Sequence, residues 1–184
     1  HSDLLLEYLK KQYPRFYFVS STTKVLTKFE QLVDELKRDD FLYVVPDFRL
    51  NKQFEKLNSL SEVYKQKVEF LCNECCWYGC KDRRECYKTV SKQNLGIDCT
   101  DHICKAPYSN EGYRFSRVME SPGFISLDDI LNIYVPMGYS NFKIEGRDLG
   151  NALLLEFILY YMVKPQYQIH VREEMYLDAM LDLF

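Results

Sequence analysis

The sequence lacks several features that would place it in a broad class of protein. No apolar run approaches the roughly 18 residues that a membrane span needs; the closest, residues 152–163, is short and contains Glu156. There is no excess of charge of one sign either, because the formal net charge is −3. Nucleic-acid binding therefore has no broad electrostatic support. We expect a globular domain without a membrane segment, and we expect residues 152–163 to form a buried helix.

Familiar catalytic motifs are also missing. The sequence contains no glycine-rich phosphate loop, no G-x-S-x-G nucleophile elbow and no set of protein-kinase motifs, so these chemistries have no support. Its three histidines form no H-E-x-x-H pattern, which is the usual signature of a zinc protease. No pair of residues points to peptide hydrolysis.

Short apolar runs alternate with segments of helical periodicity. The runs at residues 16–19, 42–45 and 68–71 recur at intervals of roughly 26 residues and are separated by helix-length segments. This order is the signature of right-handed β-α-β units in a parallel sheet. It resumes with a strand at 141–147 and a long helix at 149–163. The sequence predicts an α/β fold, a TIM-like (β/α) barrel that is incomplete in this chain.

Further elements follow from capping and periodicity. Ser126, with Asp129 three residues later, predicts a capped helix that begins near Leu127. The other expected elements are helices at 3–12, 26–36, 51–64 and 173–183, and a strand at 168–171.

The whole chain, residues 1–184, is predicted to be one barrel-type domain. A cysteine-rich segment, about residues 72–123, is inserted after the third strand, and connections of this length are usually functional or disordered. Residue 1 is a histidine followed at once by an amphipathic pattern, so we expect the chain to begin inside a longer protein or after a removed tag. An incomplete barrel would need a partner chain or a second copy to close it.

The chain has seven cysteines, and five of them fall between residues 72 and 86. Clustering of this kind favours metal binding in a reduced compartment over a disulfide scaffold, so we predict a cytoplasmic protein. The spacing C-x3-C-x5-C suits either a tetrahedral zinc ion or an iron–sulfur cluster. We interpret Cys72 as a small buried hydrophobe. The candidate ligands are Cys76, Cys80 and Cys86, with Cys104 as the fourth and Cys99, Cys75 or His102 as its alternatives.

Polar and charged side chains follow each predicted strand. Because ligands bind at the carboxyl ends of parallel strands, we expect these side chains to face one shared mouth. Arginine is favoured there because its planar guanidinium matches carboxylate or phosphate. The candidate catalytic residues are Glu74, Glu145 and Arg147, and the candidate substrate-binding residues are Arg49, Asp47, Asn73 and Lys143.

Two motifs resemble those of the peptidase U32-like superfamily. The strand-end motif K-I-E-G-R stands complete at residues 143–147. The looser pattern N-E-x-C-x3-C-x2-R-x2-H-Y, found in uncharacterised bacterial and phage relatives, is matched with Cys86 in place of His. The resemblance spans roughly residues 2–172. The matching residues of this second pattern are Asn73, Glu74, Cys76, Cys80, Arg83 and Tyr87.

The resemblance implies a (β/α) barrel with a [4Fe–4S] cluster near its mouth, which Glu145 and Arg147 would line. Its ligands would be Cys76, Cys80, Cys86 and Cys104. Some members of the superfamily hydroxylate ubiquinone precursors or RNA bases without oxygen, and others are described as collagenase-like peptidases. We therefore expect an iron–sulfur-dependent redox enzyme that acts on a small molecule or RNA. The alternatives are a non-enzymatic interaction domain stabilised by zinc and a U32-type peptidase.

Overall fold

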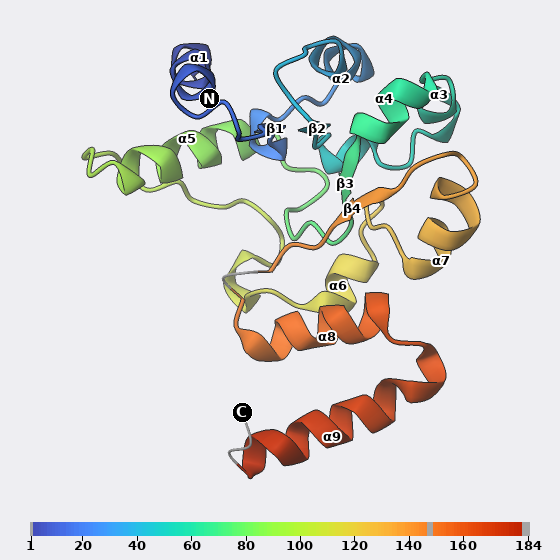
Figure 1. Cartoon of the computed structure of the whole chain (residues 1–184). Coiled ribbons are helices and arrows are strands. Elements are labelled where there is room, and N and C mark those ends of the chain that lie inside the picture. The colour runs from blue at the N-terminus through green and yellow to red at the C-terminus, as the bar shows by residue number, and fades with distance from the viewer. Residues whose placement is uncertain (1, 147–148, 182–184) are drawn as a thin grey trace.

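The structure, a computed structural model, describes residues 2–146 and 149–181 (Figure 1). It is rich in helix, which makes up 51% of it, and its strands are short. The strands are β1 (Val19–Ser20), β2 (Tyr43–Val44), β3 (Glu69–Leu71) and β4 (Asn141–Lys143). The helices are α1 (Asp3–Gln12), α2 (Phe29–Leu36), α3 (Phe54–Asn58), α4 (Glu62–Lys67), α5 (Arg83–Asn94), α6 (Phe115–Met119), α7 (Leu127–Asp129), α8 (Asn151–Met162) and α9 (Gln168–Met180).

The strands form two small parallel sheets. In the first, β1 pairs with β2, and in the second, β3 pairs with β4, with Phe70 opposite Phe142. An isolated parallel bridge between Val44 and Val68 joins the two pairs. Neighbouring strands are therefore parallel, and their carboxyl ends lie on the same side.

The prediction of a TIM-like (β/α) barrel is wrong. A barrel closes a full ring of parallel strands, whereas the described residues form only two two-stranded sheets in an α-rich fold. One physical reason lies in the apolar run at 16–19, which was expected to be a buried strand. Phe16 and Tyr17 are 65% and 68% exposed, and only Val19 of that run enters β1. The expectation that a partner chain closes a barrel therefore loses its basis.

Two local predictions are also corrected. The helix expected at 51–64 is divided into α3 and α4, because the Ser61 hydroxyl accepts a hydrogen bond from the Tyr64 N–H (3.4 Å) and so begins a new helix. The strand expected at 168–171 is instead the start of α9. There the Gln168 amide donates to the carbonyls of Leu159 and Val163 (both 3.1 Å), which ties the first turn of α9 to the end of α8.

Other local predictions are confirmed. Helix α1 covers residues 3–12, and α7 begins with the expected capping box, in which the Asp129 N–H donates to the Ser126 hydroxyl (3.0 Å). A π-helical turn, Ile130–Tyr134, continues α7. Helix α8 buries Phe157 and Leu159 but leaves Met162 exposed, so it is buried on one side only. No helix in the described ranges is long and apolar enough to cross a membrane.

One apolar core joins β2, β3, α2, α3 and the π-helical turn. The ring of Phe70 lies at its centre, 4.8 Å from the ring of Tyr134 and 5.0 Å from that of Tyr139. Both tyrosine hydroxyls donate to backbone carbonyls, so their burial leaves no unsatisfied donor. Cys72 lies in this core, as predicted. The apolar core consists of Leu32, Leu36, Phe41, Val44, Leu50, Leu57, Leu60, Val68, Phe70, Cys72, Ile125, Tyr134 and Tyr139.

The cysteine-rich segment is fastened to this core at both ends. The Asn51 amide donates to the carbonyl of Leu71 (3.0 Å) and to that of Gly123 (2.8 Å), and the Ile125 N–H donates to the Cys72 carbonyl (3.0 Å). Gly123 passes so close to Phe48 that a Cβ there would lie 2.7 Å from the Phe48 carbonyl oxygen. Both ends of the segment are thus brought to the carboxyl end of β3.

Candidate functional site

Three strand ends meet at the guanidinium of Arg83, in the first turn of α5. Its Nη1 donates to Asp47 Oδ2 (2.7 Å) and Thr22 Oγ1 (3.3 Å), and its Nη2 donates to Glu74 Oε2 and the Tyr87 hydroxyl (3.0 Å). Thr22, Asp47 and Glu74 follow β1, β2 and β3 respectively. The structure therefore brings together Asp47 and Glu74, as the strand-end argument expects. Arg83, at the centre, was recognised as part of a motif but not as a site residue.

The end of β4 joins this group through Asn73. The Asn73 amide donates to the Glu145 carbonyl (3.0 Å) and accepts from the Glu145 N–H (2.7 Å). The Cys75 thiol then lies 2.8 Å from Glu145 Oε1 and 3.9 Å from Glu74 Oε1. Burial, and next the charge of Glu74, raise the pKa of Glu145 to about 7. This carboxyl group can exchange a proton near neutral pH, as a catalytic acid or base must.

The remaining predicted substrate-binding residues are engaged within the chain. Arg49 donates from Nη1 to Asp47, from Nε to the Tyr78 carbonyl (2.9 Å) and from Nη2 to the Cys80 carbonyl. Arg49 thus fixes the loop after β3. The Lys143 ammonium lies 3.9 Å from Glu69 Oε2. Arg147, a predicted catalytic residue, lies outside the described residues.

The four predicted cysteine ligands lie before, within and after α5 in the chain. Cys76 and Cys80 lie on the loop after β3, Cys86 lies in the first turns of the helix, and Cys104 lies on the returning chain. An ion pair between the Lys105 ammonium and Asp82 (2.7 Å) holds that returning chain against the helix start.

The pKa values of two of these thiols are shifted by the groups near them. Burial raises the pKa of Cys86, and the neighbouring thiols of Cys76, Cys104 and Cys80 raise it further. At Cys76 the balance is reversed: the neighbouring Cys75 thiol and, to a smaller extent, the Arg83 guanidinium lower the pKa of the thiol despite its burial. A lowered pKa favours the thiolate, which is the form that binds metals.

The spacing of the donor atoms bears on which metal group they could hold. A zinc ion with four thiolates at about 2.3 Å holds the sulfurs only about 3.8 Å apart. Within the described part of the chain, the one set of three metal-ligating atoms all within 4.8 Å of one another belongs to Glu74, Cys75 and Glu145. The four thiols around α5 are therefore more widely spaced than a single ion requires. In a [4Fe–4S] cluster each thiolate binds a different iron, so wider spacing is expected.

The alternative fourth ligands are placed differently. Cys75 is turned towards Glu145, and the Cys99 thiol lies 3.9 Å from the Thr89 carbonyl, further along α5. His102 lies near Asp82, whose pKa is lowered first by Lys105 and, more weakly, by His102.

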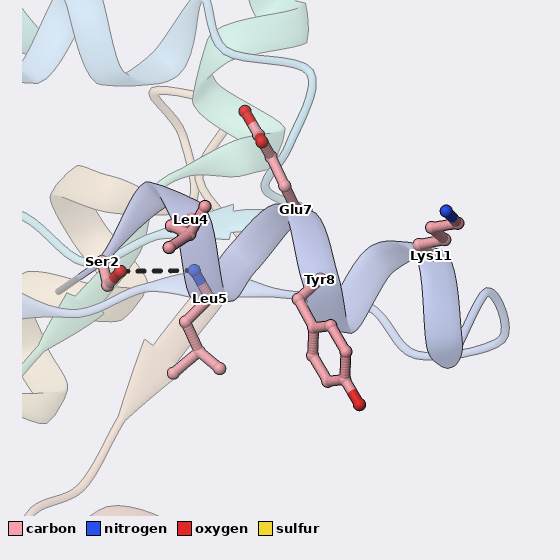
Figure 2. Close-up of a pocket in the computed structure, with 6 residues that line it drawn as sticks. All are labelled: Ser2, Leu4, Leu5, Glu7, Tyr8 and Lys11. Carbon is pink, nitrogen blue, oxygen red and sulfur yellow. Dashed lines mark hydrogen bonds between the residues drawn. The ribbon is translucent and has the colours of Figure 1, made fainter.

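A surface hollow runs along α1, away from these groups in sequence (Figure 2). The Ser2 hydroxyl at one end accepts a hydrogen bond from the Leu5 N–H (3.2 Å) and caps the helix. None of the predicted site residues lines the hollow, so it is not the candidate site. Its lining residues are Ser2, Leu4, Leu5, Glu7, Tyr8 and Lys11.

No protein-family model matches the chain, and comparison with curated proteins and with solved structures gave no match either. The resemblance to the U32-like superfamily therefore stays a prediction that rests on the two motifs.

Proposed function

We propose that this protein binds a [4Fe–4S] cluster through Cys76, Cys80, Cys86 and Cys104 and acts as an iron–sulfur-dependent redox protein in the cytoplasm. The observation that supports the proposal is that Cys76, Cys104 and Cys80 lie near enough to Cys86 for their charges to raise the pKa of its thiol. All seven cysteines are free thiols, which is in keeping with a reducing compartment.

The chemistry of the donor set supports the proposed cluster. Thiolates are the usual ligands of such clusters, and these four thiols are spread more widely than a single metal ion requires. When bound, the cluster would supply one-electron transfer. The chain itself contributes the Arg49 contacts that fix the loop of Cys80 and the Asp82–Lys105 ion pair that holds Cys104 nearby.

We further propose that a substrate binds beside Cys76, at the ends of β3 and β4. Glu74, Cys75 and Glu145 point towards one another there, and Cys75 is exposed. A carboxyl pair next to a redox group can orient a small molecule and remove a proton. Hydroxylation of an organic substrate with water as the oxygen donor releases two protons and two electrons; the carboxyl pair would take the protons, and the cluster would pass the electrons one at a time to an external acceptor. The resemblance to cluster-dependent hydroxylases of the U32-like superfamily is a further argument for this class of reaction over peptide hydrolysis.

A zinc-stabilised interaction domain is the second candidate. It is favoured by the close approach of Glu74, Cys75 and Glu145, whose ligand atoms are near enough for one metal ion. A zinc site here would use Cys75, which the cluster proposal leaves free, so the two candidates require different cysteines.

Anaerobic purification separates the two candidates. We expect a coloured protein with stoichiometric iron and acid-labile sulfide, whereas a colourless protein with stoichiometric zinc would contradict the cluster. Serine replacement of each of the four proposed ligands should remove most of the iron. Cys99→Ser and Cys75→Ser are matched controls and should retain it. Loss of metal in Cys75→Ser together with full metal in Cys86→Ser would favour the zinc candidate.

A further inference from the structure

Arg83 is the only buried residue between residues 75 and 117, and it is 2% exposed. Its guanidinium lies between two aromatic rings, 5.0 Å from the ring centre of Phe48 and 5.2 Å from that of Tyr87. A cation in such a place is costly unless it is paired and hydrogen-bonded. Its burial therefore needs a local explanation.

Two buried carboxylates provide part of that explanation. Asp47 is fully buried and Glu74 is 5% exposed, and both accept hydrogen bonds from the guanidinium, on different nitrogens. Arg83 Nε, in contrast, is buried with no hydrogen-bond partner among the described residues. The two terminal nitrogens of Arg83 therefore both donate to carboxylates, and its Nε–H is left as a donor without a partner in the described part of the chain.

The guanidinium is also linked to one of the proposed metal ligands. The Glu74 carboxylate that accepts from Arg83 Nη2 also accepts, on its other oxygen, from the Cys76 N–H (3.1 Å), so Arg83 and Cys76 share one carboxylate. Arg83 is thus the one buried cation of this segment, next to a proposed thiolate ligand, with a free N–H donor. Charge near a cluster and hydrogen bonds to its sulfurs are two of the means by which a protein sets the cluster's reduction potential.

We infer that Arg83 is a positioning residue that raises the reduction potential of the cluster by placing one buried positive charge, balanced by Asp47 and Glu74, beside Cys76. This inference rests on the proposed function. Reduction here means that the cluster accepts one electron from an external one-electron donor, and no bond is formed or broken. The added negative charge is stabilised by the guanidinium and opposed by the Glu74 carboxylate.

The test is the reduction potential of the anaerobically purified protein, measured by optical titration with dithionite and mediator dyes. In Arg83→Gln we expect at least a tenfold loss in the equilibrium constant for reduction, which corresponds to a fall of about 59 mV for one electron. Glu74→Gln should shift the potential in the opposite direction, because it removes a negative charge at the same place. Arg83→Lys, which keeps the charge, should restore most of the wild-type value.

Lys92→Gln is the matched control, since it removes one positive charge from the exposed end of the same helix and should leave the potential unchanged. If Arg83→Gln fails to fold, Glu74→Gln still tests the inference, because it leaves Arg83 in place and should raise the reduction potential. Potentials of both variants equal to that of Lys92→Gln would overturn the inference while leaving the cluster in place. A wild-type protein without iron would overturn the proposed function and this inference with it.

Discussion

The apolar core and the cysteine-rich segment are stabilised by different forces. In the core, side chains such as Phe70, Val44 and Val68 are fully buried and contact one another across the two small sheets. Between residues 75 and 117 the single buried side chain is charged. There the chain is fixed by ion pairs and by donors such as Arg49 that bind backbone carbonyls.

This difference implies different responses to mutation. Burial of apolar surface is spread over many contacts, so loss of one large core side chain lowers the stability of everything that packs on it. A buried ion pair is concentrated in a few atoms, and removal of one partner leaves the other charge uncompensated. We therefore expect core variants to unfold the whole molecule and charge variants to open the cysteine-rich segment first.

The largest effect is expected for Phe70→Ala. Removal of the ring leaves a cavity among Tyr134, Tyr139 and Phe142, and we expect the free energy of unfolding to fall by about 3–5 kcal/mol. Urea denaturation followed by far-UV circular dichroism measures this change. Val63→Ala, at a position 70% exposed on α4, is the control and should stay within about 0.5 kcal/mol of wild type. A loss for Phe70→Ala no greater than that of the control would contradict the description of the core.

The core was largely predictable from the sequence, and the overall architecture was not. The runs 42–45 and 68–71 are mostly apolar and contain β-branched and aromatic residues, and both place a short strand in the core. The run 16–19 has the same composition, but most of it is exposed. Periodicity and composition cannot tell how far a strand extends or how many strands pair, because long-range packing decides both.

The second prediction tests the ion pairs that fix the cysteine-rich segment. Asp47→Asn removes the carboxylate charge that holds both Arg49 and Arg83, and we expect a local loss of about 3 kcal/mol. The cysteine-rich segment should become sensitive to trypsin while the far-UV signal of the core stays native. Asp34→Asn, which removes an exposed carboxylate paired with Lys37, should leave proteolysis unchanged. If Asp47→Asn is as resistant as wild type, Arg83 is not the anchor of the segment.

Part of the candidate site could also be read from the sequence. The strand-end rule found Asp47, Glu74 and Glu145 because parallel strands present their carboxyl ends on one side. It could not find Arg83, since α5 is too polar to show a clear apolar face and was not expected as a helix. A signal was present in the spacing: Arg83 precedes Tyr87 by one helical turn, and a buried arginine needs such partners. Distances between thiols depend on the path of the loops, which no spacing rule gives.

The smallest effect is expected for Asp129→Asn, which removes an ion pair at the edge of the apolar core. The Asp129 carboxylate accepts from the Lys52 ammonium (2.6 Å) and caps α7. Although burial alone would raise it, these hydrogen bonds lower the pKa of Asp129 below its usual value of 3.8. A carboxyl group whose pKa is lower in the folded state stabilises the protein at pH values above its unfolded-state pKa, and this contribution is lost as the pH falls through the folded-state pKa.

Asp129→Asn should therefore lower the free energy of unfolding by about 1 kcal/mol at pH 7 and leave it unchanged in strong acid. Urea denaturation across that pH range measures it, with Asp128→Asn, on the exposed side of the same turn, as control. A loss as large as that of Asp47→Asn would mean that ion pairs matter equally in both regions and would abolish the distinction between them.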